Sequence, residues 1–183
     1  MRNLMFTASL LLSTSAFAGD HDPARIAGLM NTAKMSLAEG IEYAEKTSGV
    51  ATSAKFEIAD DGKLELSVYT IPEGLNVEAE KSQLTELSGH ASEDLGKLKA
   101  TVFADKEHIA RSSVHLTLRQ LSKMSLKQIV EKAEKVASGQ AIDVRNPIVR
   151  NSKPVADVVV VGKNQKISTV TIDLLSGQAS KKL

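Results

Sequence analysis

The chain has 183 residues, with 23 Lys and Arg against 22 Asp and Glu and a formal net charge of +1 at pH 7. It contains no Cys, which excludes a disulfide framework and a lipid anchor on Cys. It has no Trp and only 3% of its residues are aromatic, so stacking surfaces for sugars or nucleic acid are not expected.

Residues 1–18 have the three parts of a cleavable secretory signal peptide. Arg2 supplies the positive region, residues 4–12 form an uncharged, mostly apolar stretch, and Ala16-Phe17-Ala18 places small residues at the cleavage position. This stretch is far shorter than the roughly 20 residues that cross a bilayer, and no later stretch has that length. We therefore expect a periplasmic or secreted protein that begins near Gly19 and has no membrane span.

Charge is unevenly distributed along the rest of the chain. Residues 19–123 carry a net charge of −5, whereas residues 124–183 carry a net charge of +5. This pattern predicts attraction between the two parts of the chain, and a basic face for an acidic partner is the alternative.

Residues 19–34 are expected to form a tail followed by a short helix that begins at Asp22-Pro23. Cleavage after Ala18 would place His21 third in the chain, after Gly19 and Asp20. A free amine, two backbone amides and an imidazole can enclose Cu(II) or Ni(II) in a square plane, so His21 is a candidate metal ligand. The alternative is an ordinary unstructured tail.

The sequence also contains an internal repeat, which is sought before a fold is assigned. The segment that starts at Lys34 matches the one that starts at Lys123 in eight of thirteen positions, at an offset of 89 residues. Residues 87–92 match residues 175–180 in five of six positions, at an offset of 88. We expect a tandem duplication. Its parts are repeat 1 at 35–92, a partly helical connecting segment at 93–123 and repeat 2 at 124–183.

Each repeat is predicted to open with a helix. Ser36 with Glu39, and Ser125 with Gln128, have the spacing of a capping box. In the second repeat an apolar stripe follows at helical spacing and consists of Leu126, Ile129, Val130, Ala133, Val136 and Ala137. Gly49 and Gly139 are the expected ends of the two helices.

Strands are predicted after each helix. In repeat 1, alternating apolar residues flank the turn Asp60-Asp61-Gly62-Lys63, which indicates a hairpin. In repeat 2 the strand candidates are residues 142–150, 155–161 and 167–175. Residues 92–105 suit either a helix or a fourth strand, and residues 112–123 suit a short helix.

The expected fold class is therefore α+β. It consists of two tandem repeats, each a helix or helix pair packed on one face of an antiparallel three- to four-stranded sheet. The opposite face of each sheet is left for water or a partner.

Three features of the repeats resemble the PepSY domain family. They are the capped helix of residues 36–46, the turn Asp60-Asp61-Gly62, and the third strand that ends in the Asp-x-x-x-Gly corner of residues 173–177. Repeat 1 departs from the pattern because Thr85 stands where repeat 2 has Asp173, and repeat 2 lacks the Asp-Gly turn.

The resemblance implies a non-enzymatic binding or regulatory role, such as modulation or inhibition of an envelope or secreted protease. The tandem architecture is also similar to that of the β-lactamase inhibitor protein. The expected partner is an exported protein.

Catalytic signatures are missing from the sequence. There is no Gly-x-Ser-x-Gly elbow, His-Glu-x-x-His pair or phosphate-binding glycine loop. His90, His108 and His115 are isolated, and Asp60-Asp61 suits a turn better than a calcium loop. We expect no enzymatic activity, no cofactor and no nucleic-acid partner. The alternative function is that of a periplasmic Cu/Ni-binding protein that uses His21.

Overall fold

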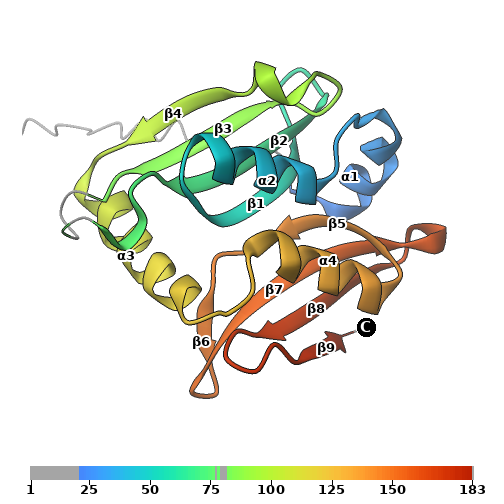
Figure 1. Ribbon diagram of the computed structural model, residues 1–183. Helices are drawn as coiled ribbons and strands as arrows, with labels where there is room; N and C mark the ends of the chain where they lie inside the picture. Colours follow the sequence, from blue (N-terminus) through green and yellow to red (C-terminus); the bar gives the residue numbers. More distant parts are fainter. Residues whose placement is uncertain (1–20, 77, 79–81, 183) are drawn as a thin grey trace, which may run out of the picture.

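The computed structural model describes residues 21–76, 78 and 82–182 (Figure 1). The predicted signal peptide and two members of the proposed metal site, Gly19 and Asp20, lie outside the described residues. The expected α+β class is confirmed, because helices pack on an antiparallel sheet of nine strands. Across the described residues, no helix is long and apolar enough to cross a membrane.

The elements have the following bounds. The α-helices are α1 (Pro23–Leu29), α2 (Leu37–Thr47), α3 (Lys106–Gln120) and α4 (Leu126–Ala137). The strands are β1 (Val50–Ile58), β2 (Leu64–Ile71), β3 (Leu84–His90), β4 (Lys99–Phe103), β5 (Gly139–Val144), β6 (Ile148–Arg150), β7 (Lys153–Gly162), β8 (Ile167–Asp173) and β9 (Ala179–Lys182).

All nine strands belong to one sheet rather than to two. The strand order is β4-β3-β2-β1-β5-β7-β8-β9, with β6 paired to β7. The pairing of β1 with β5 joins the two halves and is short, with Ala54 opposite Val144 and Lys55 opposite Asp143. The prediction of a separate sheet in each repeat was therefore wrong, because each first strand pairs along its free edge with the other.

The helices α2 and α4 cover the same face of the sheet and contact each other (Figure 1). Both predicted capping boxes are present, with the hydroxyls of Ser36 and Ser125 accepting from the N–H groups three residues later. The apolar stripe of α4 is buried except at Val136, which is 41% exposed. Below these helices lies the main apolar core, which includes the first-strand residues Ala54, Phe56 and Ile58.

The connecting segment is more structured than expected. Residues 99–103 form the strand β4, which settles the choice left open for residues 92–105 in favour of a strand. The helix expected at 112–123 is longer and begins earlier, because Asp105 caps it by accepting from the N–H groups of Glu107 and His108. The strand expected at 142–150 is two strands, β5 and β6, with Pro147 between them.

Gly139 has a different role from the one expected. The left-handed residue that ends α4 is Ser138, with φ of 57°, and Gly139 already belongs to β5. A Cβ atom on Gly139 would lie 2.2 Å from the carbonyl oxygen of Val161. Gly49, after α2, is in a similar position, where a Cβ atom would lie 2.5 Å from the carbonyl oxygen of Ile71. Both glycines permit close approach of the next hairpin.

The sequence match between residues 87–92 and 175–180 does not join equivalent positions. Leu87 lies within β3 and is 7% exposed, whereas Leu175 lies in the turn after β8 and is 57% exposed. Their correspondence in the alignment was wrong, because the connection between β7 and β8 is shorter than that between β2 and β3.

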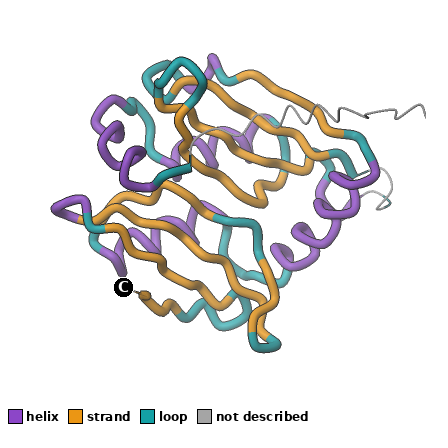
Figure 2. Tube along the Cα trace, turned by 180° about the vertical axis from the view of Figure 1, so that it is seen from behind, coloured by secondary structure: helices purple, strands orange, loops and turns teal. Residues whose placement is uncertain are grey.

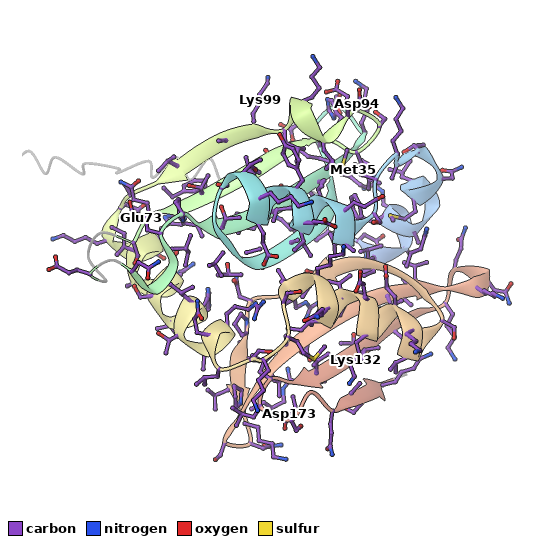
Figure 3. All side chains as sticks on the ribbon, viewed as in Figure 1. Met35, Glu73, Asp94, Lys99, Lys132 and Asp173 are labelled. Carbon is purple, nitrogen blue, oxygen red and sulfur yellow. The ribbon has the colours of Figure 1, made fainter. Side chains whose placement is uncertain are left out.

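Backbone hydrogen bonds identify the corresponding positions. The N–H of Ala91 donates to the carbonyl of Leu64, and the N–H of Leu174 donates to the carbonyl of Pro154. His90 and Asp173 thus have the same place, since each directly precedes the residue that donates this bond, whereas Thr85 lies near the start of β3. Asp173 shapes the corner after β8, because its Oδ1 atom accepts from the backbone N–H groups of Leu175 and Ser176 (Figure 3).

Candidate functional site: the charged seam of the sheet

The candidate site lies on the face of the sheet opposite α2 and α4, which we call the open face. Figure 2 shows this face, with α1 and α3 at its two sides and the central strands in view between them. Because side chains alternate along a strand, the residues between the core positions of β1 point to the open face. They include Ser53, Lys55 and Glu57, which face Tyr69, Ser67 and Glu65 of β2.

Lys55 is the centre of this site. Its Nζ atom lies 2.7 Å from Oε2 of Glu57 and 3.2 Å from Nε2 of His21. It also lies 5.9 Å from the centre of the Tyr69 ring. We call the junction of β1 with β5 the seam. Across the seam, Lys55 of β1 lies opposite Asp143 of β5. Lys55 is therefore surrounded by residues of β1, β2 and β5 and of the segment before α1.

Two carboxylates directly opposite each other are an unusual feature of this face. Glu57 of β1 faces Glu65 of β2, and like charges in such a pair are destabilising. Glu57 is compensated, because its Oε1 atom accepts from Ser67 at 2.9 Å and its Oε2 atom accepts from Lys55. Burial raises the pKa of Glu65, and the charge of Glu57 raises it further. Burial also raises the pKa of Tyr69.

Asp143 and Arg145 extend the site across the seam. Nε of Arg145 donates to Oδ2 of Asp143 at 3.0 Å. Burial raises the pKa of Asp143, although Arg145, His21 and Lys55 act in the opposite direction. The backbone N–H of Arg145 donates to the carbonyl oxygen of Asp157 at 3.0 Å, which fixes the chain where it leaves β5.

A glutamate on each helix shapes the strand that follows it. Oε1 of Glu134 accepts from the N–H of Ala141 at 2.9 Å, at the bulge that precedes Asp143. Glu45 has a corresponding position on α2, where the backbone N–H of Ala51, at the bulge that precedes Ser53, acts to lower the pKa of its carboxyl group. Burial raises the pKa of both glutamates. These carboxylates lie beside the bulges that precede the open-face residues Ser53 and Asp143.

Two hollows adjoin at the seam, because both are lined by Lys55, Asp143 and Arg145. The first has a volume of about 290 Å³ and is also lined by His21, Pro23, Ile26, Phe56, Ile142 and Val159. The second has a volume of about 300 Å³ and is also lined by Ser53, Ala54, Tyr69, Val144 and Asn146. A further hollow of about 240 Å³ lies on the helix side, beside Met30 and Glu39.

His21, the candidate metal ligand, lies at this seam. Its Nε2 atom is 3.5 Å from Oε2 of Glu57, and its side chain is 52% exposed. Because Gly19 and Asp20 lie outside the described residues, the proposed square-planar site is not described by the structure. Within residues 21–76, 78 and 82–182, no group of three or more His, Asp or Glu residues is placed to hold a metal ion.

The other candidate residues lie away from the seam and have separate partners. Asp61 pairs with Lys63 at 2.8 Å within its turn, and His90 lies 3.5 Å from Asp61. His108 bonds Asp105, its helix cap, at 2.6 Å. The structure does not bring the three histidines together.

Sequence reasoning missed the seam residues Lys55, Asp143 and Arg145. Their positions in strands of alternating polarity indicated exposed side chains, but no sequence motif connects the three residues. No family model, no curated protein and no solved structure matches this chain.

Proposed function

We propose that the protein is an exported, non-enzymatic binding module that contacts another exported protein through its open face. The observation that carries the proposal is the charged seam at the centre of that face. There Lys55, Asp143 and Arg145 line two adjoining hollows. Interfaces favour such places, where Arg and Tyr side chains stand beside small hollows that a partner can fill.

The arrangement of the two halves supports a tandem duplication as the origin of this surface. Each half has a helix that begins with a capping box and that carries a half-buried glutamate near the bulge of the next strand. The strand order reads the same from β1 outward as from β5 outward, apart from β6. This supports a tandem duplication in which β4 extends the first half beyond the repeat expected at 35–92, and it fits the resemblance to PepSY domains.

That resemblance suggests the kind of partner. It favours an envelope or secreted enzyme, such as a protease, whose activity the module modulates. The contacts at the seam suit recognition better than catalysis. Lys55 is bonded to Glu57 and Arg145 is bonded to Asp143, so both cations are held in position beside the hollows, as a recognition surface requires.

The proposal is tested by site-specific crosslinking in the envelope. A photo-crosslinking residue is placed at Asn146 or Ser88 on the open face, and at Lys135, an exposed residue of α4, as the matched control. We expect one protein to be captured from both open-face positions and not from Lys135. Equal capture from all three positions, or no capture from Asn146 and Ser88, would refute the proposal.

A further inference from the structure

The two hollows at the seam differ in chemistry, and this difference suggests what a partner presents to them. The first hollow has an apolar floor, because Ile26, Phe56, Ile142 and Val159 are each at most 4% exposed. It is large enough for one apolar side chain. The floor forms where β1 and β5 separate beyond their two paired positions and α1 packs against both strands.

The second hollow is lined mainly by hydrogen-bond donors. Among the described residues that line it, those whose side chains carry N–H or O–H groups are Ser53, Lys55, Tyr69, Arg145 and Asn146, and Asp143 is the only one with a carboxylate. Its charged lining therefore has a net charge of +1. The other acidic side chains of the open face, which include Glu57 of β1 and Asp157 of β7, line neither hollow, although Glu57 bonds Lys55.

Arg145 retains N–H groups that can donate to a partner. Only its Nε atom bonds Asp143, and its two terminal nitrogens make no hydrogen bond within the described part of the chain. The side chain is 59% exposed. A guanidinium group held at Nε offers its remaining N–H groups as a planar fork, which matches the geometry of a carboxylate.

We infer that the partner inserts an extended segment carrying an apolar residue and an Asp or Glu residue next but one to it. This inference rests on the binding function proposed above. Alternate side chains of an extended segment project to the same side, so two such residues reach adjoining hollows. The apolar side chain fills the first hollow, and the carboxylate bonds Arg145 above the second.

The test uses three peptides and the ¹⁵N-labelled protein. The acetylated, amidated pentapeptides are Thr-Leu-Thr-Asp-Thr, Thr-Leu-Thr-Asn-Thr and Thr-Ala-Thr-Asp-Thr. We expect the first to shift the backbone amide signals of Lys55, Asp143 and Arg145 at millimolar concentration. The Asn and Ala peptides should each bind about tenfold more weakly, since each lacks one of the two contacts.

Variants of the protein distinguish the contact between Arg145 and the peptide carboxylate from nonspecific peptide binding. Arg145→Gln should abolish the preference for the Asp peptide over the Asn peptide, and Arg145→Lys should retain part of it. Arg111→Gln, a change at an exposed arginine of α3, should leave the preference intact. The dispersion of the amide spectrum reports whether each variant is folded.

The inference is overturned if the Asp and Asn peptides bind equally, if the shifts lie outside the seam, or if none appears at millimolar peptide. An unchanged preference in Arg145→Gln overturns it as well. Its failure differs from that of the binding function. If a partner crosslinks at Asn146 but the protein does not prefer the Asp peptide, the proposed binding function is supported and this inference fails. If the Asp peptide binds but no partner crosslinks, this inference is supported and the proposed binding function fails.

Discussion

Replacing Glu134 with Ala removes the carboxylate that bonds the bulge of β5. Its partner at 2.9 Å, the N–H of Ala141, belongs to a residue that is 1% exposed, and this N–H loses its acceptor unless water enters the hollow of about 240 Å³ that both residues line. An unsatisfied buried N–H costs about 1–3 kcal/mol. For a domain of this size that corresponds to a fall in Tm of about 3–10 °C.

The assay is unfolding by urea and by heat, followed by far-UV circular dichroism. Glu131→Ala is the matched control, because Glu131 lies on the same helix and has a side chain that is 51% exposed. Its contact with Lys127, at 3.8 Å, is an exposed ion pair of little stabilising value. The control should therefore change the free energy of unfolding by less than about 0.5 kcal/mol.

Glu134→Gln distinguishes the hydrogen bond from the charge, because it keeps an acceptor oxygen. Burial raises the pKa of Glu134 above its ordinary value of 4.5, so the ionised carboxylate is disfavoured in the folded state. The stabilising contribution of the protonated Glu134 side chain is fully present below pH 4.5. It is lost as the pH rises through the raised pKa. The wild type should therefore lose stability relative to Glu134→Gln over this interval.

Two results would refute this reasoning. One is an effect of Glu134→Ala no larger than that of Glu131→Ala. The other is a stability difference between the wild type and Glu134→Gln that does not change with pH.

Further predictions concern three other places in the chain. Gly139→Ala should destabilise the fold by about 1–3 kcal/mol in urea unfolding, because its Cβ atom meets a backbone oxygen, whereas Gly28→Ala, with no atom within 4 Å, should not destabilise it. Glu65→Gln should raise the unfolding free energy at pH 7 by about 0.2–1 kcal/mol, since it removes a like-charge pair, and a gain that persists at pH 3 would contradict this cause. If the chain that begins after Ala18 forms the copper site, Cu(II) titration should give a visible d-d band, and a band that survives His21→Ala would exclude that site.

The local parts of the fold were predictable because local chemistry determines them. Ser36 and Ser125 each precede an N3 side chain of the right type, and the turn at Gly62 separates two alternating strands. The pairing of β1 with β5 was not predictable, since alternation shows which side chains of a strand share a face but not which strand lies beside it. The match that includes Leu175 was misleading, because turn residues are similar in unrelated turns.

The site was predictable only in part. Alternation in β1 placed Lys55 and Glu57 opposite the core, and the expected free face of the sheet is the open face of the structure. Glu57, the partner of Lys55 at 2.7 Å, is local, but His21 and Asp143 come from segments distant in sequence, so no local pattern indicates them. Their proximity depends on the junction of the two halves.

The junction of β1 with β5 has a consequence for how the two halves can change. In a symmetric dimer of identical units, every contact across the junction occurs twice, and one substitution alters both copies. If the protein arose by duplication within one chain, that constraint is lifted. Lys55 faces Asp143 on one side of the junction without any need for the same pair on the other. Each half is free to acquire its own chemistry while the fold is kept.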